Sequence, residues 1–186
     1  MRIIAGRHRG RNLETAPGTA LRPTAERARA ALFNILAHGH LTPRPAYEDA
    51  IVLDAFAGTG ALGLEALSRG ARFASFLEKD RVARALLTVN LAHLGETPHG
   101  NVIAGDALRP PRSSAPANLV FLDPPYAEDA AGPALIALAV AGWLGAGALA
   151  VAEISAKRSL TPVPGFEIVD ERRYGAAKLI FLRYTV

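Results

Sequence analysis

The chain has 186 residues, of which 50% are hydrophobic and 20% are charged, as expected for a folded domain with a sizeable core. It contains no cysteine, which excludes disulfides, zinc ribbons and mechanisms that use a thiolate. No apolar run approaches the roughly 20 residues that span a bilayer, and the first residues lack the apolar core of a signal peptide. We therefore expect a cytoplasmic protein without a membrane partner.

The positive charge of the chain is concentrated near its N-terminus. The net charge is +4 at pH 7, but seven arginines and two glutamates between Met1 and Arg29 give that segment +5 and leave −1 for the rest. Guanidinium groups are permanently charged and match phosphate, so this segment predicts contact with nucleic acid. A solvated loop is the alternative, because arginine outnumbers lysine 18 to 3 in the whole chain. The predicted phosphate contacts are Arg7, Arg9, Arg11 and Arg22.

The predicted elements begin with two short extended segments, residues 2–5 and 12–15, which flank the basic loop as a hairpin. Thr24 is a suitable N-cap for a helix that runs to Ala37. Strands and helices then alternate, and short apolar strands without internal alternation indicate a parallel sheet buried on both faces. The expected strands are 51–53, 73–77, 102–104, 119–122 and 148–152, with a closing pair at 168–174 and 178–184. The expected helices are 61–68, 81–94 and 130–144.

A glycine pattern follows the first strand of this alternating region. Gly58-x-Gly60-x-x-Gly63 opens a helix, and ligands of open α/β sheets bind at this edge. The glycines fit a dinucleotide-binding turn, so an NAD-dependent oxidoreductase is one interpretation. Against it, the carboxylate of Asp54 would repel a pyrophosphate and attract an ammonium group. S-adenosylmethionine, with an amino acid at one end and an adenosine at the other, matches both features.

Acidic residues also follow the next two strands. Glu78 closes the second strand and could accept hydrogen bonds from ribose hydroxyls, while Asp106 follows the third and could accept one from the adenine amine. A single acid at a strand end is usually only solvated, but acids after successive strands beside a glycine turn favour one cofactor site. The residues assigned to S-adenosylmethionine are Asp54, Phe56, Gly58, Thr59, Gly60, Glu78, Lys79, Asp106 and Ala107.

The strand at 119–122 ends in Asp123-Pro124-Pro125-Tyr126. Proline fixes its own φ and restricts the residue before it, so Asp123 is held rigidly at the strand tip. Neither proline can continue a ladder, which leaves their carbonyl groups free. A carboxylate, a carbonyl and an aromatic face suit a flat ligand that bears an amino group, and these four are the predicted catalytic residues. A proline-rich turn without function is the alternative.

Several segments resemble one family when they are taken together. They are residues 2–6, 9–11, 22–24, 31–36, 56–71 and 121–126, and they resemble the bacterial RsmD family of 16S rRNA guanine-N2 methyltransferases. The resemblance covers nearly the whole chain, with the mild departures Glu26 and Thr59. It implies an α/β, Rossmann-like class I S-adenosylmethionine-dependent methyltransferase with a mostly parallel seven-stranded sheet and a C-terminal antiparallel pair. The expected parts are a basic hairpin and helix extension at 1–45 and a catalytic domain at 46–186.

The implied reaction is methyl transfer to the exocyclic N2 of a guanine in 16S rRNA, within the small subunit or its assembly intermediate. In this reaction Asp123 and the carbonyl of Pro124 accept the amino hydrogens, and Tyr126 stacks on the base. A DNA amino-methyltransferase that acts on adenine N6 or cytosine N4 is the alternative, because it faces the same chemical problem. A non-catalytic RNA-binding module with a vestigial pocket is another. The histidines show no metal-ligand spacing, so no metal is assigned, and we expect a monomer.

Overall fold

The computed structural model describes residues 1–15, 23–38, 40–125 and 129–186, with the backbone alone for residues 23–25. Within those ranges, no helix combines the length and the apolar character needed to cross a membrane. The elements in chain order are α1 (Pro23–His38), β1 (Ile51–Asp54), α2 (Ala61–Ser68), β2 (Phe73–Glu78), α3 (Arg81–Leu94), the 3-10 turn η1 (Thr97–His99), β3 (Gly100–Ala104), β4 (Ala117–Leu122), α4 (Ala131–Val140), β5 (Leu144–Ser155), β6 (Phe166–Tyr174) and β7 (Ala177–Tyr184).

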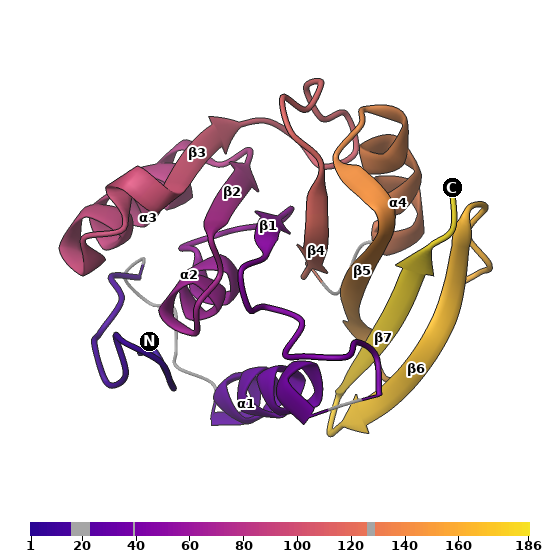
Figure 1. Ribbon diagram of the computed structural model, residues 1–186, viewed down its shortest axis with the longest axis horizontal. Coiled ribbons are helices and arrows are strands. Elements are labelled where there is room, and N and C mark those ends of the chain that lie inside the picture. The colour runs from indigo at the N-terminus through magenta and orange to yellow at the C-terminus, as the bar shows by residue number, and fades with distance from the viewer. Residues whose placement is uncertain (16–22, 39, 126–128) are drawn as a thin grey trace.

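The strands of the described residues form one seven-stranded sheet in the order β3-β2-β1-β4-β5-β7-β6 (Figure 1). The strands from β3 to β5 pair in parallel, whereas β7 runs antiparallel to both β5 and β6. From β1 the chain builds outward to β2 and β3 on one side and later returns to place β4 on the other. Between β1 and β4 the direction in which strands are added reverses. The loops that follow these two strands diverge there and leave a crevice at the carboxyl edge of the sheet. The predicted sheet and its closing antiparallel pair are confirmed.

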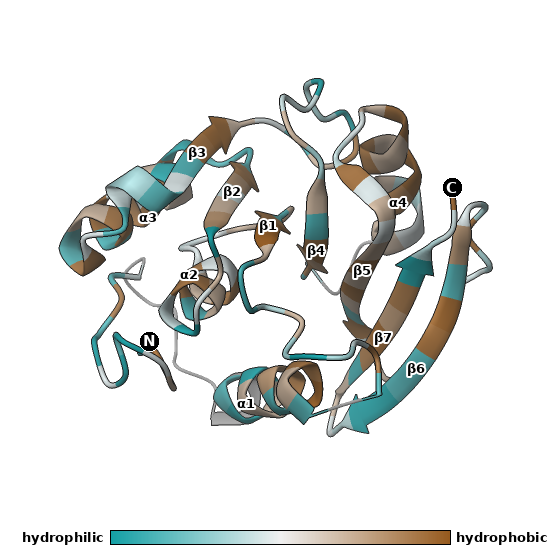
Figure 2. Cartoon of the chain, viewed as in Figure 1, coloured by the Kyte–Doolittle hydropathy of each residue, from teal (hydrophilic) through white to brown (hydrophobic). Residues whose placement is uncertain are grey.

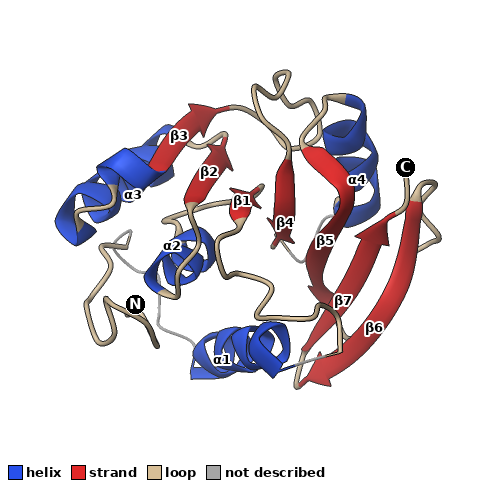
Figure 3. Ribbon diagram, viewed as in Figure 1, coloured by secondary structure: helices blue, strands red, loops and turns tan. Residues whose placement is uncertain are grey.

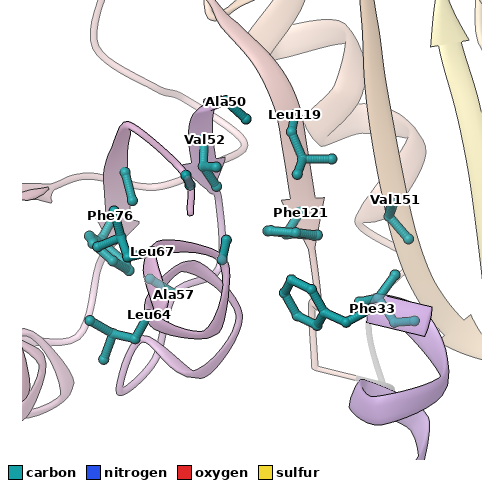
Figure 4. Packing of buried hydrophobic residues seen from close by; sticks show 14 of the residues in the cluster. Phe33, Ala50, Val52, Ala57, Leu64, Leu67, Phe76, Leu119, Phe121 and Val151 are labelled. Carbon is teal, nitrogen blue, oxygen red and sulfur yellow. The ribbon is translucent and has the colours of Figure 1, made fainter. Parts of the chain in front are cut away.

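Buried apolar side chains cover both faces of the sheet, which explains why its strands lack polar alternation. On one face α1, α2 and α3 pack against the strands, and the rings of Phe33 on α1 and Phe121 on β4 lie 5.7 Å apart between centroids (Figure 4). On the other face α4 packs against the strands, with Trp143 buried beside it. Figure 3 shows that the connection between β3 and β4 is a loop, so this second face has less helical cover. The edge strand β6 is hydrophilic at its carboxyl end, whereas its neighbour β7 is hydrophobic over its middle part (Figure 2).

The first fifteen residues fold back on themselves. The N–H of Ile3 donates to the carbonyl of Arg11 at 2.9 Å, and a single antiparallel bridge joins Arg2 and Asn12. The predicted hairpin is therefore present as a paired loop, although its arms are too short to form regular strands. Ile3 and Leu13 are buried in the same cluster as Phe33, so the N-terminal segment shares a core with the sheet.

Buried polar groups attach this N-terminal loop to α2. The Glu65 side chain is inaccessible to solvent and accepts from the N–H groups of Ile4 at 2.7 Å and Ala5 at 3.0 Å. Ser68, one turn further along, accepts from the N–H of Arg7 through its carbonyl at 2.8 Å. Hydrogen bonds from backbone N–H groups to a charged acceptor are among the strong ones, so the loop is held at a fixed position on α2.

Several predicted boundaries are wrong; β5, for example, spans Leu144–Ser155 and not 148–152. Helix α1 begins at Pro23, so Thr24 lies inside the first turn and is not the N-cap; proline suits this first position because its φ is already helical. Helix α4 ends at Val140, short of the expected residue 144, because Gly142 adopts a φ of 80° and the chain then enters β5 at Leu144.

Candidate functional site

A cavity of about 550 Å³ opens at the carboxyl edge of the sheet. Its wall is formed by the segments that follow β1, β2, β3 and β4, by β5, by the β6–β7 hairpin and by α1. In Figure 1, α1 lies below the arrowheads of β4 and β5. The structure thereby brings together most of the residues predicted for cofactor binding and catalysis, and none of the described arginines predicted to bind substrate is on this wall. The predicted residues on the wall are Phe56, Gly58, Glu78, Lys79, Asp106, Ala107, Asp123, Pro124 and Pro125.

Asp54 lies just behind this wall at the end of β1. Its side chain is 1% exposed; Oδ2 accepts from the N–H of Gly63 at 2.9 Å, and Oδ1 has no partner among the described residues. Burial raises the pKa of Asp54 to about 7; the Gly63 hydrogen bond opposes this shift and the Glu78 charge adds to it. A buried carboxylate oxygen without a donor is an incomplete site. It fits a cationic group such as the ammonium of an amino acid.

The glycine loop between β1 and α2 is shaped by packing. Gly60 adopts a φ of 87°, and a Cβ there would lie 2.3 Å from Leu87 on α3. The carbonyl of Thr59 accepts from Nδ2 of Asn90 at 3.0 Å. Thr59 and Gly60 are not on the cavity wall, so the structure gives them a part in holding the loop and leaves direct cofactor contact a prediction.

Carboxylates already occupy the amide groups that a pyrophosphate would need. Oε2 of Glu78 accepts from the N–H of Gly58 at 2.7 Å, and Asp54 takes the N–H of Gly63 in the first turn of α2. In dinucleotide sites these N–H groups and the positive helix end face the phosphates. Here they are neutralised by acids, and the geometry favours a ligand that is cationic near Asp54 over a nicotinamide dinucleotide.

Asp106 and Ala107 supply the part of the wall that follows β3. Oδ1 of Asp106 accepts from the N–H of Leu108 at 3.0 Å, and its backbone pairs with Arg109. These contacts fix a turn that keeps the carboxyl group at the cavity. Each oxygen of a carboxylate can accept more than one hydrogen bond, so Asp106 retains capacity for a ligand amine.

Asp123 stands at the tip of β4, where it borders the cavity. Asp123 is exposed on the cavity wall. Desolvation by the surrounding protein, followed by the charges of Glu153 and Asp54, raises the pKa of Asp123 above its usual range. Pro124 is buried and Pro125 is exposed beside it. Tyr126, the last member of the predicted tetrapeptide, lies outside the described residues.

The predicted RNA-binding arginines differ in their surroundings. Arg7 donates through Nε and Nη2 to the buried carboxylate of Glu96, each at 2.8 Å, so part of its capacity holds the N-terminal loop against the end of α3. Arg9 and Arg11 are exposed, and no carboxylate in the described part of the chain pairs with them. Arg22 lies outside the described residues. Phosphate binding by all four stays a prediction.

Among the wall residues that were not predicted, three have charged or hydroxyl-bearing side chains: Glu153 on β5, Arg29 on α1 and Tyr174 on β6. Glu153 directly follows a predicted strand, which is the same signal that identified Glu78, so the sequence could have shown it. Arg29 is 7% exposed and donates through Nη2 to the carbonyl of Arg2 at 2.6 Å. The position of Arg29 depends on how α1 crosses the sheet, and no local sequence pattern predicts that path.

Comparison with known proteins agrees with this geometry. The family model "Conserved hypothetical protein 95" matches residues 1–183. "Ribosomal RNA small subunit methyltransferase D" of Escherichia coli (strain K12) is 40% identical over 88% of this chain and 79% of its own length. The protein of the same name from Haemophilus influenzae is 35% identical over 94% of this chain and 89% of its own length.

A solved structure, that of yhhF from Escherichia coli, gives a TM-score of 0.83 at 36% identity and covers 100% of this chain and 98% of that one. The sheet order, the acid-lined cavity and these similarities agree with one another. The chain belongs to the family of Conserved hypothetical protein 95, the RsmD family of methyltransferases.

Proposed function

We propose that this protein transfers a methyl group from S-adenosylmethionine to the exocyclic N2 of a guanine in 16S rRNA of the small ribosomal subunit. One observation carries the proposal: Asp123 and Pro124, which suit an amino group, share a single cavity with Glu78 and Asp106, which suit an adenosine. The names of the relatives support ribosomal RNA of the small subunit as the substrate class.

The cofactor would be held by acids from three strand ends. Asp54 has a buried oxygen available for the ammonium group, Glu78 is suited to the ribose hydroxyls, and Asp106 to the adenine amine. Phe56, Lys79 and Ala107 complete this part of the wall. When bound, S-adenosylmethionine supplies an electrophilic methyl group on a sulfonium, so the protein has mainly to align the nucleophile.

The nucleophile needs help, because the lone pair of the guanine amino group is delocalised into the ring. The carboxylate of Asp123 and the carbonyl of Pro124 would accept the two amino hydrogens and turn the lone pair towards the methyl group. Asp123 can then take the proton that the nitrogen loses. Its raised pKa brings this carboxyl closer to the pKa expected of an effective proton acceptor near neutral pH. Tyr126 would stack on the base.

The substrate is a structured RNA, in which pairing hides the amino group. The guanine would be everted into the cavity and held there, while arginines bind the flanking phosphates. Arg9 and Arg11 are the exposed candidates, with Arg7 and Arg22 as the further predicted contacts. The acceptor would be rRNA in the subunit or in its assembly intermediate.

The experiment is labelled methyl transfer from S-adenosylmethionine onto hypomethylated small subunits, naked 16S rRNA and DNA in parallel, with the product nucleoside identified by mass spectrometry. The expected product is N2-methylguanosine in 16S rRNA. Label in N6-methyladenine or N4-methylcytosine of DNA would replace this function with the DNA amino-methyltransferase alternative. No transfer to any acceptor, with the cofactor bound, would favour a binding module.

A further inference from the structure

Glu153 stands beside Asp123 at the carboxyl edge of the sheet. Strands β4 and β5 pair in parallel with Leu122 opposite Ala152, so the residues that follow this pair are neighbours across the two strands. Adjacent strands lie roughly 5 Å apart, which places the two carboxyl groups within reach of one small ligand. Both line the cavity.

The two side chains also share a face of the sheet. Two residues earlier, Phe121 and Val151 belong to the cluster that packs against α1, as Figure 4 shows. Side chains of a strand alternate between faces, so residues two apart lie on the same one. Asp123 and Glu153 therefore face the α1 side, in agreement with Ala28, Arg29 and Leu32 of α1 on the same wall.

Acids stand at the carboxyl ends of three adjacent strands, β1, β4 and β5. Val52 lies in the same cluster, so Asp54 also faces the α1 side, and the buried Oδ1 of Asp54 has no partner among the described residues. Like charges at such distances repel one another in a partly desolvated site. A cofactor ammonium would satisfy Asp54, and the carboxylates of Asp123 and Glu153, which line the same cavity, suit a substrate with several N–H donors.

We propose that Glu153 selects guanine by accepting a hydrogen bond from N1–H while Asp123 and the Pro124 carbonyl hold the N2 hydrogens. This inference rests on the proposed function and names the residue that decides its substrate. Guanine presents adjacent N1–H and N2–H donors, which complement two adjacent carboxylates. Adenine and cytosine instead present a ring nitrogen lone pair beside their amino group, and that lone pair would face the Glu153 oxygen.

Rejection of the wrong base follows from the same contact. A site built to accept a hydrogen bond discriminates strongly against an analogue that lacks the donor, because the buried polar group is left unpaired. Here the analogue would also bring two lone pairs into contact, which adds repulsion to the missing bond. Glu153 thus acts as a specificity residue that touches the substrate but does not transfer a proton.

The electron balance of the step is unchanged by this assignment. The N2 lone pair forms the new nitrogen–carbon bond as the sulfur–carbon bond breaks, and the sulfonium becomes a neutral thioether. The nitrogen then loses one hydrogen as a proton to Asp123. N1–H stays on the ring throughout, and its bond to a carboxylate increases electron density at the amino group during attack.

The test uses 2-aminopurine, which keeps the 2-amino group but has a lone pair in place of N1–H. Small subunits are reconstituted with rRNA that carries guanine or 2-aminopurine at the methylated position, and kcat/KM is measured for each. The wild-type protein is expected to prefer guanine by about 100-fold or more. In Glu153→Gln, whose amide can donate to that lone pair, the preference should fall by at least about 10-fold. An unchanged preference would overturn the inference.

Two controls separate this inference from other failures. Glu167→Gln removes an exposed carboxylate on β6 and should leave the preference at the wild-type value. Calorimetric binding of S-adenosylhomocysteine reports whether Glu153→Gln is folded. If this variant does not fold, the wild-type protein alone still tests the inference, because equal rates on guanine and 2-aminopurine would refute selection by N1–H. If the wild-type product is not N2-methylguanosine, the proposed function itself fails.

Discussion

Asp54 illustrates how a single buried side chain links stability to cofactor binding. The folded protein holds its pKa at about 7, above the value of 3.8 expected in the unfolded chain, chiefly because burial disfavours the charge. Between pH 4 and pH 7 the folded state therefore binds more protons than the unfolded state at this position, and stability falls as pH rises. Above pH 7 the loss is complete and the slope from this group disappears.

Asp54→Asn should therefore stabilise the cofactor-free protein at pH 8 by about 2 kcal/mol, because it removes a buried charge and keeps an oxygen for the Gly63 N–H. Urea unfolding at pH 8 and pH 4 checks this; the gain should vanish at the lower pH. The same variant should lose most of the rise in Tm that S-adenosylmethionine gives the wild-type protein. A destabilised variant at pH 8, with Glu167→Gln as the neutral reference, would contradict this account of Asp54.

At the scale of elements, the N-terminal loop is docked by close backbone contact. Gly6 has a φ of 82°, and a Cβ there would lie 1.9 Å from the carbonyl oxygen of Ser68 on α2. Gly10 has nearly the same φ, 83°, but a Cβ there would meet nothing within 4 Å. An alanine at Gly10 therefore tests only the strain of a left-handed backbone, whereas an alanine at Gly6 tests that strain together with the close contact with α2.

Gly10→Ala should cost about 1 kcal/mol of unfolding free energy, and Gly6→Ala should cost about 3 kcal/mol because the loop must also move off α2. Denaturant melts of both variants measure the difference. Gly6→Ala should in addition increase amide hydrogen exchange at Ile4 and Ala5, whose N–H groups bind Glu65. Equal effects of the two substitutions would show that the loop is not held where the structure has it.

The elements that the sequence predicted well are those specified by local signals. The buried parallel strands appear as short apolar runs, and Asp80 and Gly95 bound α3 through a side-chain cap and a φ of 74°. Helix α4 was predicted too long because its alanine-rich sequence continues smoothly to Gly142. The start of α1 was missed because both Pro23 and Thr24 suit a helix N-terminus.

The site residues that follow strands were predicted from the sequence. Those whose position depends on tertiary contacts were missed. Asp54, Glu78, Asp106 and Asp123 each follow a strand, so parallel pairing alone brings them to one edge. The position of Arg29 depends on the path of α1 across that edge. The ion pair of Arg7 with Glu96 joins residues far apart in sequence, so a charge that suggested phosphate contact also has a structural partner.

At the scale of the whole molecule, the charges divide between a basic N-terminal loop and an acid-lined cavity. Arg9 and Arg11 are exposed on the loop, whereas acidic side chains outnumber basic ones among the residues that line the cavity. This separation suits a substrate whose backbone is anionic and whose reacting base carries N–H donors. The loop would attract the RNA and the cavity would accept only the everted base.

Replacement of both Arg9 and Arg11 by alanine should raise KM for the small subunit and leave kcat nearly unchanged, because phosphate contacts position the substrate. Each lost contact lowers the slope of log affinity against log salt by about 0.7 to 0.9, so the double variant should lose about 1.5. Binding measured across a salt series gives that slope. Arg72→Ala, which removes an arginine outside the loop that is paired with Asp49, is the control; a slope unchanged by the double variant would remove the loop from the RNA interface.

The central claim is that the tip of β4 presents a nucleophile to a cofactor held in the same cavity. The most direct measurement is Asp123→Ala, studied by single-turnover methyl transfer and by calorimetry with S-adenosylmethionine on one protein preparation. Methyl transfer should fall by about 1,000-fold or more, while the Kd of the cofactor should stay within about 3-fold, because Asp123 lies at the substrate side of the cavity. A proportional loss of cofactor affinity and rate, or an unaffected rate, would contradict the account.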